Sequence, residues 1–238
     1  MIIKLKHGRV SLALHRHQPG EGIPLLLLHQ LGGSSEDWSL EALGWNGPVY
    51  ALDLSGHGRS GHVRGGGYTA ELWAADVDVA VAELGDDAVL VGAGVSAYIA
   101  LLLAGARPLS VRGAVLLPGR GLEGGGPQPD FSQVPRPFAA SGESGDLREE
   151  PMTDPAVGFE QQLVRPVDYA RALASEAGPL ILCEDRAARP PWWRALHDVP
   201  QVHLHYGALG DALSLLASQV GCADLCTPAV TPRAARSA

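Results

Sequence analysis

The 238-residue chain has few cysteines, few lysines and no long apolar run. Its three cysteines, Cys183, Cys222 and Cys226, are too few and odd in number for a disulfide framework, and they suit a reducing cytoplasm. Only Lys4 and Lys6 are lysines, and the net charge of −8 disfavours partners such as nucleic acid or an anionic membrane. No apolar stretch approaches the roughly 20 residues of a membrane span, and the first residues lack the layout of a signal peptide. We therefore expect a cytoplasmic protein that binds neither nucleic acid nor membrane.

The sequence offers no convincing metal site. Cys222 and Cys226 lie four residues apart, on one face of a predicted helix, but no further ligands stand nearby. We interpret both as small apolar helix residues and expect no metal and no cofactor. Alanine, glycine, arginine and proline dominate the composition, which indicates a high-GC, bacterial source.

Short apolar runs alternate with helical stretches along the chain. The expected strands cover residues 2–6, 10–14, 24–28, 49–52, 88–91, 112–117, 179–183 and 202–205. Helical spacing is expected over residues 70–84, 95–105, 156–175 with a break at Pro166, 192–196 and 208–220. This alternation predicts a mostly parallel sheet with helices on both faces, preceded by an antiparallel hairpin.

One stretch departs from this alternation. Residues 119–155 are rich in glycine, proline, serine and charge, which predicts a long or poorly ordered loop. Residues 227–238 are small and polar, and we expect them to be a disordered tail. We therefore place one domain over residues 1–226, with a cap-like insertion at residues 119–175.

Three polar loops each follow a core strand. They read His-Gln-Leu-Gly-Gly-Ser at residues 29–34, Asp-Leu-Ser-Gly-His-Gly-Arg-Ser at residues 53–60 and Gly-Ala-Gly-Val-Ser-Ala at residues 92–97. In this order they resemble the HG-type loop, the D-x-x-G-x-G-x-S turn and the nucleophile elbow of the α/β-hydrolase family. The resemblance implies the α/β-hydrolase fold, an eight-stranded, mostly parallel sheet flanked by helices, here with a reduced or flexible cap.

The elbow departs from the family at its central residue. Aligned without a gap, Gly94 stands where the family has its nucleophilic serine. Glycine adopts the strained turn freely, so Gly94 keeps the turn but removes the hydroxyl, and no acyl-enzyme can form there. Gly94-Val95-Ser96 also reads G-x-S, but Ser96 falls inside the start of the helix. We interpret Ser96 as a packing or capping residue, and not as a substitute nucleophile.

The other two triad positions are also weak. The resemblance places the acid after strand 179–183, where Asp185 is the better candidate, although a solvated carboxylate paired with a nearby arginine is equally expected. Leu209 or Gly210 stands where the family has its histidine. His205 is close in sequence, but it lies at a strand end and would need a shifted loop to reach the pocket.

The binding groups of the family are backbone atoms, which survive side-chain substitution. By resemblance, the oxyanion hole is formed by the N–H groups of Leu31 and Val95, and we expect this polar cradle to persist. Gln30 replaces the usual glycine of the HG pair, where it adds an amide at the pocket mouth or marks a less constrained turn. His29 is expected to be a structural, hydrogen-bonding histidine.

The cap-like insertion carries Phe131, Phe138 and Phe159. These rings are candidates to cover a ligand in the pocket, and anchoring a surface loop is a comparably good interpretation.

The resemblance leaves three functions open. The first is an enzyme that binds a small apolar substrate and promotes a cyclisation, elimination, isomerisation or pericyclic step by positioning, as diverted members of the family do in bacterial natural-product pathways. The second is a non-catalytic ligand-binding or partner protein. The third, which the register disfavours, is an esterase using Ser96, His205 and Asp185. We rank the first slightly above the second, leave the oligomeric state open, and expect the space above Gly94 to discriminate between them.

Overall fold

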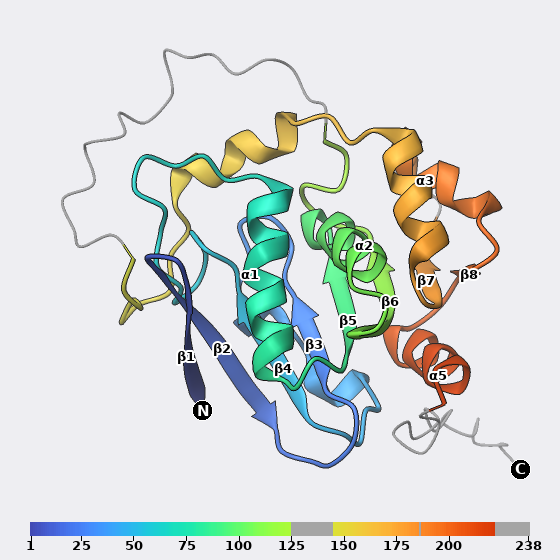
Figure 1. Ribbon diagram of the computed structural model, residues 1–238, viewed down its shortest axis with the longest axis horizontal. Helices are drawn as coiled ribbons and strands as arrows, with labels where there is room; N and C mark the ends of the chain where they lie inside the picture. The colour runs from blue at the N-terminus through green and yellow to red at the C-terminus, as the bar shows by residue number, and fades with distance from the viewer. Residues whose placement is uncertain (125–144, 186, 222–238) are drawn as a thin grey trace, which may run out of the picture.

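The computed structural model describes residues 1–124, 145–185 and 187–221, which form one sheet with helices on both faces (Figure 1). The strands are β1 Ile2–His7, β2 Val10–Gln18, β3 Leu25–Leu28, β4 Val49–Asp53, β5 Ala88–Ala93, β6 Val111–Leu117, β7 Leu180–Cys183 and β8 Val202–His205. Their order in the sheet is β1-β2-β4-β3-β5-β6-β7-β8. β1 and β2 pair antiparallel with each other, β2 pairs antiparallel with β4, and every other pairing is parallel. The predicted α/β-hydrolase fold is therefore confirmed.

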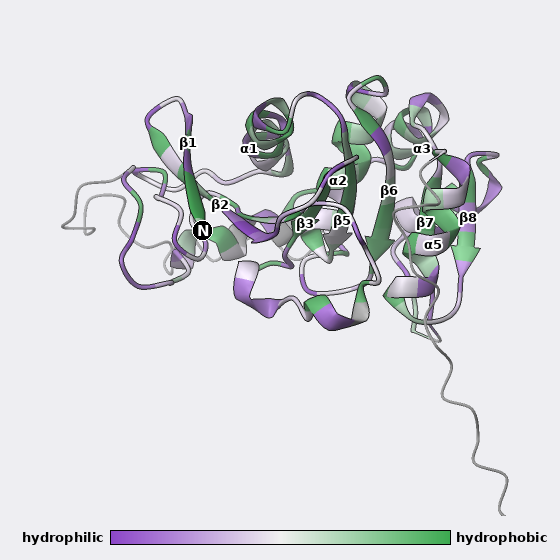
Figure 2. Cartoon of the chain, turned by 90° about the horizontal axis from the view of Figure 1, so that it is seen from below, coloured by the Kyte–Doolittle hydropathy of each residue, from purple (hydrophilic) through white to green (hydrophobic). Residues whose placement is uncertain are grey.

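The helices divide between the two faces of the sheet (Figure 2). The α-helices are α1 Ala70–Glu83, α2 Val95–Ala106, α3 Val167–Glu176, α4 Pro191–Arg194 and α5 Leu209–Gln219. The 3₁₀ segments are η1 Ser35–Asp37, η2 Leu40–Ala42, η4 Pro155–Gln162 and η5 Ala195–Asp198. α1, α2 and α3 cover one face, and α5 packs on the other. Pro166 is the N-cap of α3, so the predicted break there is confirmed.

The central strands are apolar along their whole length because both of their faces are covered. All four residues of β3 are fully buried. Leu26 and Leu28 belong to the core beneath α1 and α2, while Leu25 and Leu27 belong to the core beneath α5. This two-residue alternation places the carboxyl end of β3 between two packed layers, and the loop that follows it is held on a rigid base.

The segment η4 lies across the carboxyl ends of the parallel strands (Figure 1). It belongs to the predicted cap-like insertion, residues 119–175, of which residues 125–144 lie outside the described residues, and with them Phe131 and Phe138. The predicted tail and both Cys222 and Cys226 also lie outside them. Within the described ranges, no helix has the length and apolar character needed to cross a bilayer.

Candidate functional site

The turn between β5 and α2 has the geometry of a nucleophile elbow. Gly94 adopts φ 59° and ψ −120°, a conformation that strains any residue with a side chain. At Gly92 an added Cβ would overlap the Ser96 carbonyl oxygen and lie 2.9 Å from the Ala97 nitrogen, so the helix starts directly against the strand. The predicted turn is present, and its central residue carries no nucleophile.

The space above Gly94 is filled by backbone. Residues 119–121, which follow β6 and are called the plug loop below, pass directly over the elbow. A Cβ added to Gly94 would overlap the Arg120 carbonyl oxygen and lie 2.8 Å from both the Arg120 nitrogen and the Gly119 carbonyl carbon. A side chain at position 94 and the plug loop therefore exclude each other.

The Arg120 carbonyl occupies the oxyanion hole. Its oxygen accepts hydrogen bonds from the Leu31 N–H at 3.2 Å and from the Val95 N–H at 2.9 Å. These are the two donors that the family resemblance assigned to substrate. The expected cradle of two converging N–H groups is therefore present, but in this structure a carbonyl of the same chain satisfies both of them.

Two side chains hold the plug loop in place. Gln30 Oε1 accepts the Arg120 N–H at 3.0 Å, and Arg165 Nη2 donates to the Gly121 carbonyl at 2.7 Å. The Arg120 peptide is thus bonded through both its N–H and its C=O. Gln30, which replaces a glycine of the family pattern, is the acceptor that this arrangement requires.

Arg165 belongs to a buried ion pair at the base of the cap. Its guanidinium lies 3.0 Å from the Glu160 carboxylate and 4.9 Å from the centre of the Tyr98 ring. The side chains of Arg165 and Glu160 are 1% and 0% exposed. Burial raises the pKa of Glu160, and the charge and hydrogen bond of Arg165 oppose this shift. The cap and the plug loop are therefore joined through one buried charge pair.

The two histidines nearest the site have structural roles. His29 Nε2 accepts the Leu54 N–H at 3.2 Å, and its Nδ1 donates to the Gln30 carbonyl at 2.8 Å. His57 Nε2 accepts the Gly32 N–H at 3.1 Å. Burial lowers the pKa of both rings, which keeps them neutral and able to accept. His29 is thus the structural histidine that the sequence predicts.

Asp53 ties the other two loops together. Its carboxylate accepts the N–H groups of Ser35 at 2.7 Å and Arg59 at 2.8 Å, and it lies 2.9 Å from the His15 ring. Burial alone would raise the pKa of Asp53, but these hydrogen bonds lower it to about 2. The D-x-x-G-x-G-x-S turn therefore stabilises the loops, and its carboxylate is fully engaged.

Ser96 is a packing residue. It is fully buried, and its Oγ donates to the His29 carbonyl at 2.5 Å. The N-cap of α2 is Gly94, so of the two interpretations offered by the sequence, packing is the one that the structure supports. A buried hydroxyl that is already bonded to backbone is not available to attack a substrate.

Asp185 and His205 lie away from the elbow. Asp185 is 57% exposed and pairs with the Ala187 N–H and the Arg189 guanidinium, each at 2.7 Å. His205 ends the edge strand β8, three strands from β5 or about 14 Å at ordinary strand spacing. Its Nε2 donates to the Ala208 carbonyl at 3.2 Å. Ser96, His205 and Asp185 are therefore not brought together as a triad.

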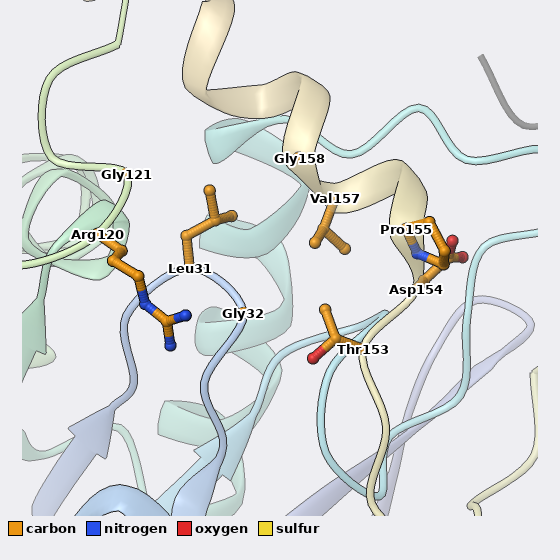
Figure 3. A pocket seen from close by; sticks show the side chains of 9 residues that line it. All are labelled: Leu31, Gly32, Arg120, Gly121, Thr153, Asp154, Pro155, Val157 and Gly158. Atoms are coloured by element: carbon orange, nitrogen blue, oxygen red, sulfur yellow. The ribbon is translucent and has the colours of Figure 1, made fainter. Parts of the chain in front are cut away.

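An open pocket of about 390 Å³ lies beside the plug loop (Figure 3). Its lining residues come from the loop after β3, the plug loop and the start of η4: Leu31, Gly32, Arg120, Gly121, Thr153, Asp154, Pro155, Val157 and Gly158. Of the residues expected to bind a ligand, Leu31 lines this pocket, whereas His29, Gln30 and Val95 hold or support the plug loop.

Removing the Gln30 side chain is expected to loosen the plug loop. Gln30→Ala deletes the acceptor of the Arg120 N–H, at a cost of about 1 kcal/mol. Hydrogen exchange at the Leu31 and Val95 amides should then become faster, because both exchange when the Arg120 carbonyl withdraws. Gln18→Ala is the matched control, since Gln18 donates to backbone carbonyls of Trp45 and Gly47 elsewhere. Equal exchange of the two amides in both variants would contradict the role of Gln30.

The comparisons with known proteins agree with this fold. A family model described as "Alpha/beta hydrolase family" matches residues 25–237, so the chain belongs to the α/β-hydrolase family. A hypothetical protein, PA1622 from Pseudomonas aeruginosa PAO1, is 19% identical with a TM-score of 0.64, over 94% of this chain and 97% of that one. No curated protein matches the sequence.

Two further solved structures show how broadly this fold is used. A thioesterase domain from the curacin biosynthetic pathway is 17% identical with a TM-score of 0.62, over 93% of this chain and 97% of that one. The bottromycin epimerase BotH, solved with bottromycin A2, is 17% identical with a TM-score of 0.60, over 95% and 99%. At such identities the likeness concerns the fold alone.

Proposed function

We propose that this chain binds a small, partly apolar molecule in the pocket beside the plug loop and forms no covalent intermediate with it. The observation that supports this is the position of the Arg120 carbonyl. It accepts both N–H groups that would polarise a substrate carbonyl, and it lies directly above a glycine. A bound ester would meet neither a nucleophile nor free oxyanion donors, so hydrolysis by the family's route has no starting point.

The filled space above Gly94 reverses the ranking suggested by the sequence. A non-hydrolytic enzyme would need the two N–H groups of the oxyanion cradle to bind its substrate. Both of these groups donate hydrogen bonds to the Arg120 carbonyl instead. The pocket itself remains, with the apolar side chains of Leu31 and Val157 facing each other across it (Figure 3). Binding without chemistry is therefore the function that the geometry favours.

A second candidate is a cyclisation, elimination, isomerisation or pericyclic step in bacterial secondary metabolism. The shared fold of a bottromycin epimerase and a curacin-pathway thioesterase supports such a setting. With the donors of Leu31 and Val95 occupied, only positioning of the substrate would remain to accelerate a reaction, so we place this candidate second. If mass spectrometry detected a chemical change in a bound ligand, the enzymatic function would become the first candidate.

Two measurements test the proposed function. The wild-type protein is expected to remain unlabelled by a fluorophosphonate probe and to leave p-nitrophenyl butyrate intact, because position 94 is a glycine and Ser96 is buried and bonded to the His29 carbonyl. Small aromatic fragments should shift the amide NMR signals of Gly32, Gly121 and Gly158, which line the pocket. Labelling at Ser96 or ester turnover would instead favour a hydrolase, and the absence of any fragment binding at these amides would refute a ligand-binding role.

A further inference from the structure

The pocket has an apolar half and a polar half. In Figure 3 the Leu31 and Val157 side chains face each other on one side, while Arg120 and Thr153 lie on the other. Two charged residues, Arg120 and Asp154, are among the lining residues. The charge that a ligand meets depends on which of these two is already neutralised by the protein.

Both carboxylate oxygens of Asp154 accept hydrogen bonds from the protein. Its Oδ2 accepts the Tyr68 hydroxyl at 2.8 Å, and its Oδ1 accepts the Ala156 N–H at 2.9 Å. Figure 3 shows its carboxylate turned away from the pocket. Both oxygens thus serve to start η4 and to hold the loop around Tyr68, and neither faces a ligand.

The Arg120 guanidinium is in the opposite situation. Within the described ranges it makes no hydrogen bond or ion pair, although its backbone is bonded on both sides. Its Nη1 lies 3.7 Å from where a Cβ on Gly32 would stand, so the guanidinium reaches across the loop after β3. A cation without a partner among the described residues, on an anchored backbone and beside a small apolar surface, is available to bind an anion.

We propose that the ligand carries a carboxylate, bound by the Arg120 guanidinium, and an apolar body that lies against the pocket wall formed by Leu31, Pro155 and Val157. This inference rests on the proposed ligand-binding function and adds the chemical class. A guanidinium forms paired hydrogen bonds with a carboxylate, and one such group beside an apolar surface suits a singly charged, amphipathic molecule. A volume of about 390 Å³ accommodates an aryl or branched alkyl acid.

The test compares three matched series: phenylacetate, 3-phenylpropionate and 4-phenylbutyrate, their primary amides, and the corresponding amines. Binding is measured by titration, following the amide NMR signals of Gly32, Gly121 and Gly158. We expect the best acid to bind at least about fivefold more tightly than its amide, and the amine to bind most weakly.

Arg120→Gln is the decisive variant because it removes the charge and leaves the backbone hydrogen bonds of the plug loop in place. It should reduce acid binding to the level of the amide. Arg194→Gln on α4, an exposed arginine that does not line the pocket, is the matched control and should change nothing.

Each outcome has a distinct meaning. Amides that bind as well as acids, or an acid preference that survives Arg120→Gln, would overturn the carboxylate class while leaving the ligand-binding function in place. If Arg194→Gln lowered acid binding as much as Arg120→Gln, the effect would come from the net charge of the protein. That result would also overturn the carboxylate class. Binding of none of the three series would refute the proposed function together with this inference.

Discussion

Gly94→Ser is expected to give a less stable protein without esterase activity, although it restores the family's nucleophile. The new Cβ would overlap the Arg120 carbonyl oxygen, so the plug loop would have to leave. The variant would lose the hydrogen bonds to Leu31, Val95 and Gln30 and would strain the backbone at φ 59°. Together these effects cost about 2–5 kcal/mol, measured by urea denaturation. No ester should be turned over, because His205 and Asp185 lie away from the elbow.

Gly8→Ser is a control for a positive φ without steric overlap. Gly8 has φ 58°, almost the same as Gly94, and nothing lies within 4 Å of where its Cβ would stand. The positive φ alone should therefore cost about 1 kcal/mol in this control. If Gly94→Ser were no more destabilising than Gly8→Ser, the Arg120 carbonyl would not occupy the oxyanion hole in solution. If p-nitrophenyl butyrate were hydrolysed by Gly94→Ser, a general base would exist that the described residues do not reveal.

The fold could be predicted from the sequence because its signals are local. The run Leu25–Leu28 is apolar at every position, which indicates a strand buried on both faces, and it pairs with β4 and β5 as such a strand must. Pro166 fixes a helix boundary through its own ring geometry. The elbow was predictable for the same reason, since Gly92 and Gly94 stand in one short turn.

The plug loop could not be predicted because it joins backbone atoms that are distant in sequence. The Arg120 N–H donates to the Gln30 side chain across 90 residues, and the Arg120 carbonyl accepts from the Leu31 and Val95 N–H groups, so the Arg120 side chain takes no part in these bonds. Gln30 and Gly94 were each recognised as departures from the family pattern, but their common cause was not. The sequence signal was the combination of three features. Gln30 adds an acceptor, Gly94 lacks a side chain, and a Gly-Arg-Gly sequence follows the next core strand at residues 119–121.

The plug loop also explains why the elbow is well packed without a side chain at position 94. In a hydrolase the two oxyanion donors face solvent or substrate, but here Leu31 and Val95 donate to protein. A donor pair that is buried without a partner costs free energy, and the Arg120 carbonyl removes that cost. Both N–H groups are therefore satisfied within the protein, and the pocket of about 390 Å³ lies beside them.

The second large effect is expected at the ion pair between the cap and the plug loop. Arg165→Met leaves the Glu160 carboxylate buried without its cation and the Gly121 carbonyl without its donor. Removing one partner of such a pair costs about 3–5 kcal/mol near neutral pH. Arg112→Met is the control, because Arg112 forms an exposed pair with Asp87 and should cost about 1 kcal/mol or less.

The dependence on pH identifies the buried charge as the cause. The pKa of Glu160 is already raised by burial, and loss of Arg165 raises it further. The unfolded carboxyl, by contrast, ionises near its ordinary value of 4.5. The cost of Arg165→Met should therefore be smallest at low pH, where the carboxyl is protonated in both the folded and the unfolded chain, and should grow as pH rises from 4.5 through the raised pKa of the folded state. Urea denaturation at pH 5 and pH 8 measures this difference.

A double variant separates the charge of Glu160 from the other contacts of Arg165. Glu160→Gln combined with Arg165→Met removes both charges, so most of the stability should return and the pH dependence that Arg165→Met adds should disappear. The Gly121 carbonyl still lacks its donor in that variant, so exchange at the Leu31 and Val95 amides should remain faster than in the wild type. A double variant that stays as unstable as Arg165→Met would mean that the arginine acts through its packing on Tyr98 or its hydrogen bond to the Gly121 carbonyl, and not through the charge of Glu160.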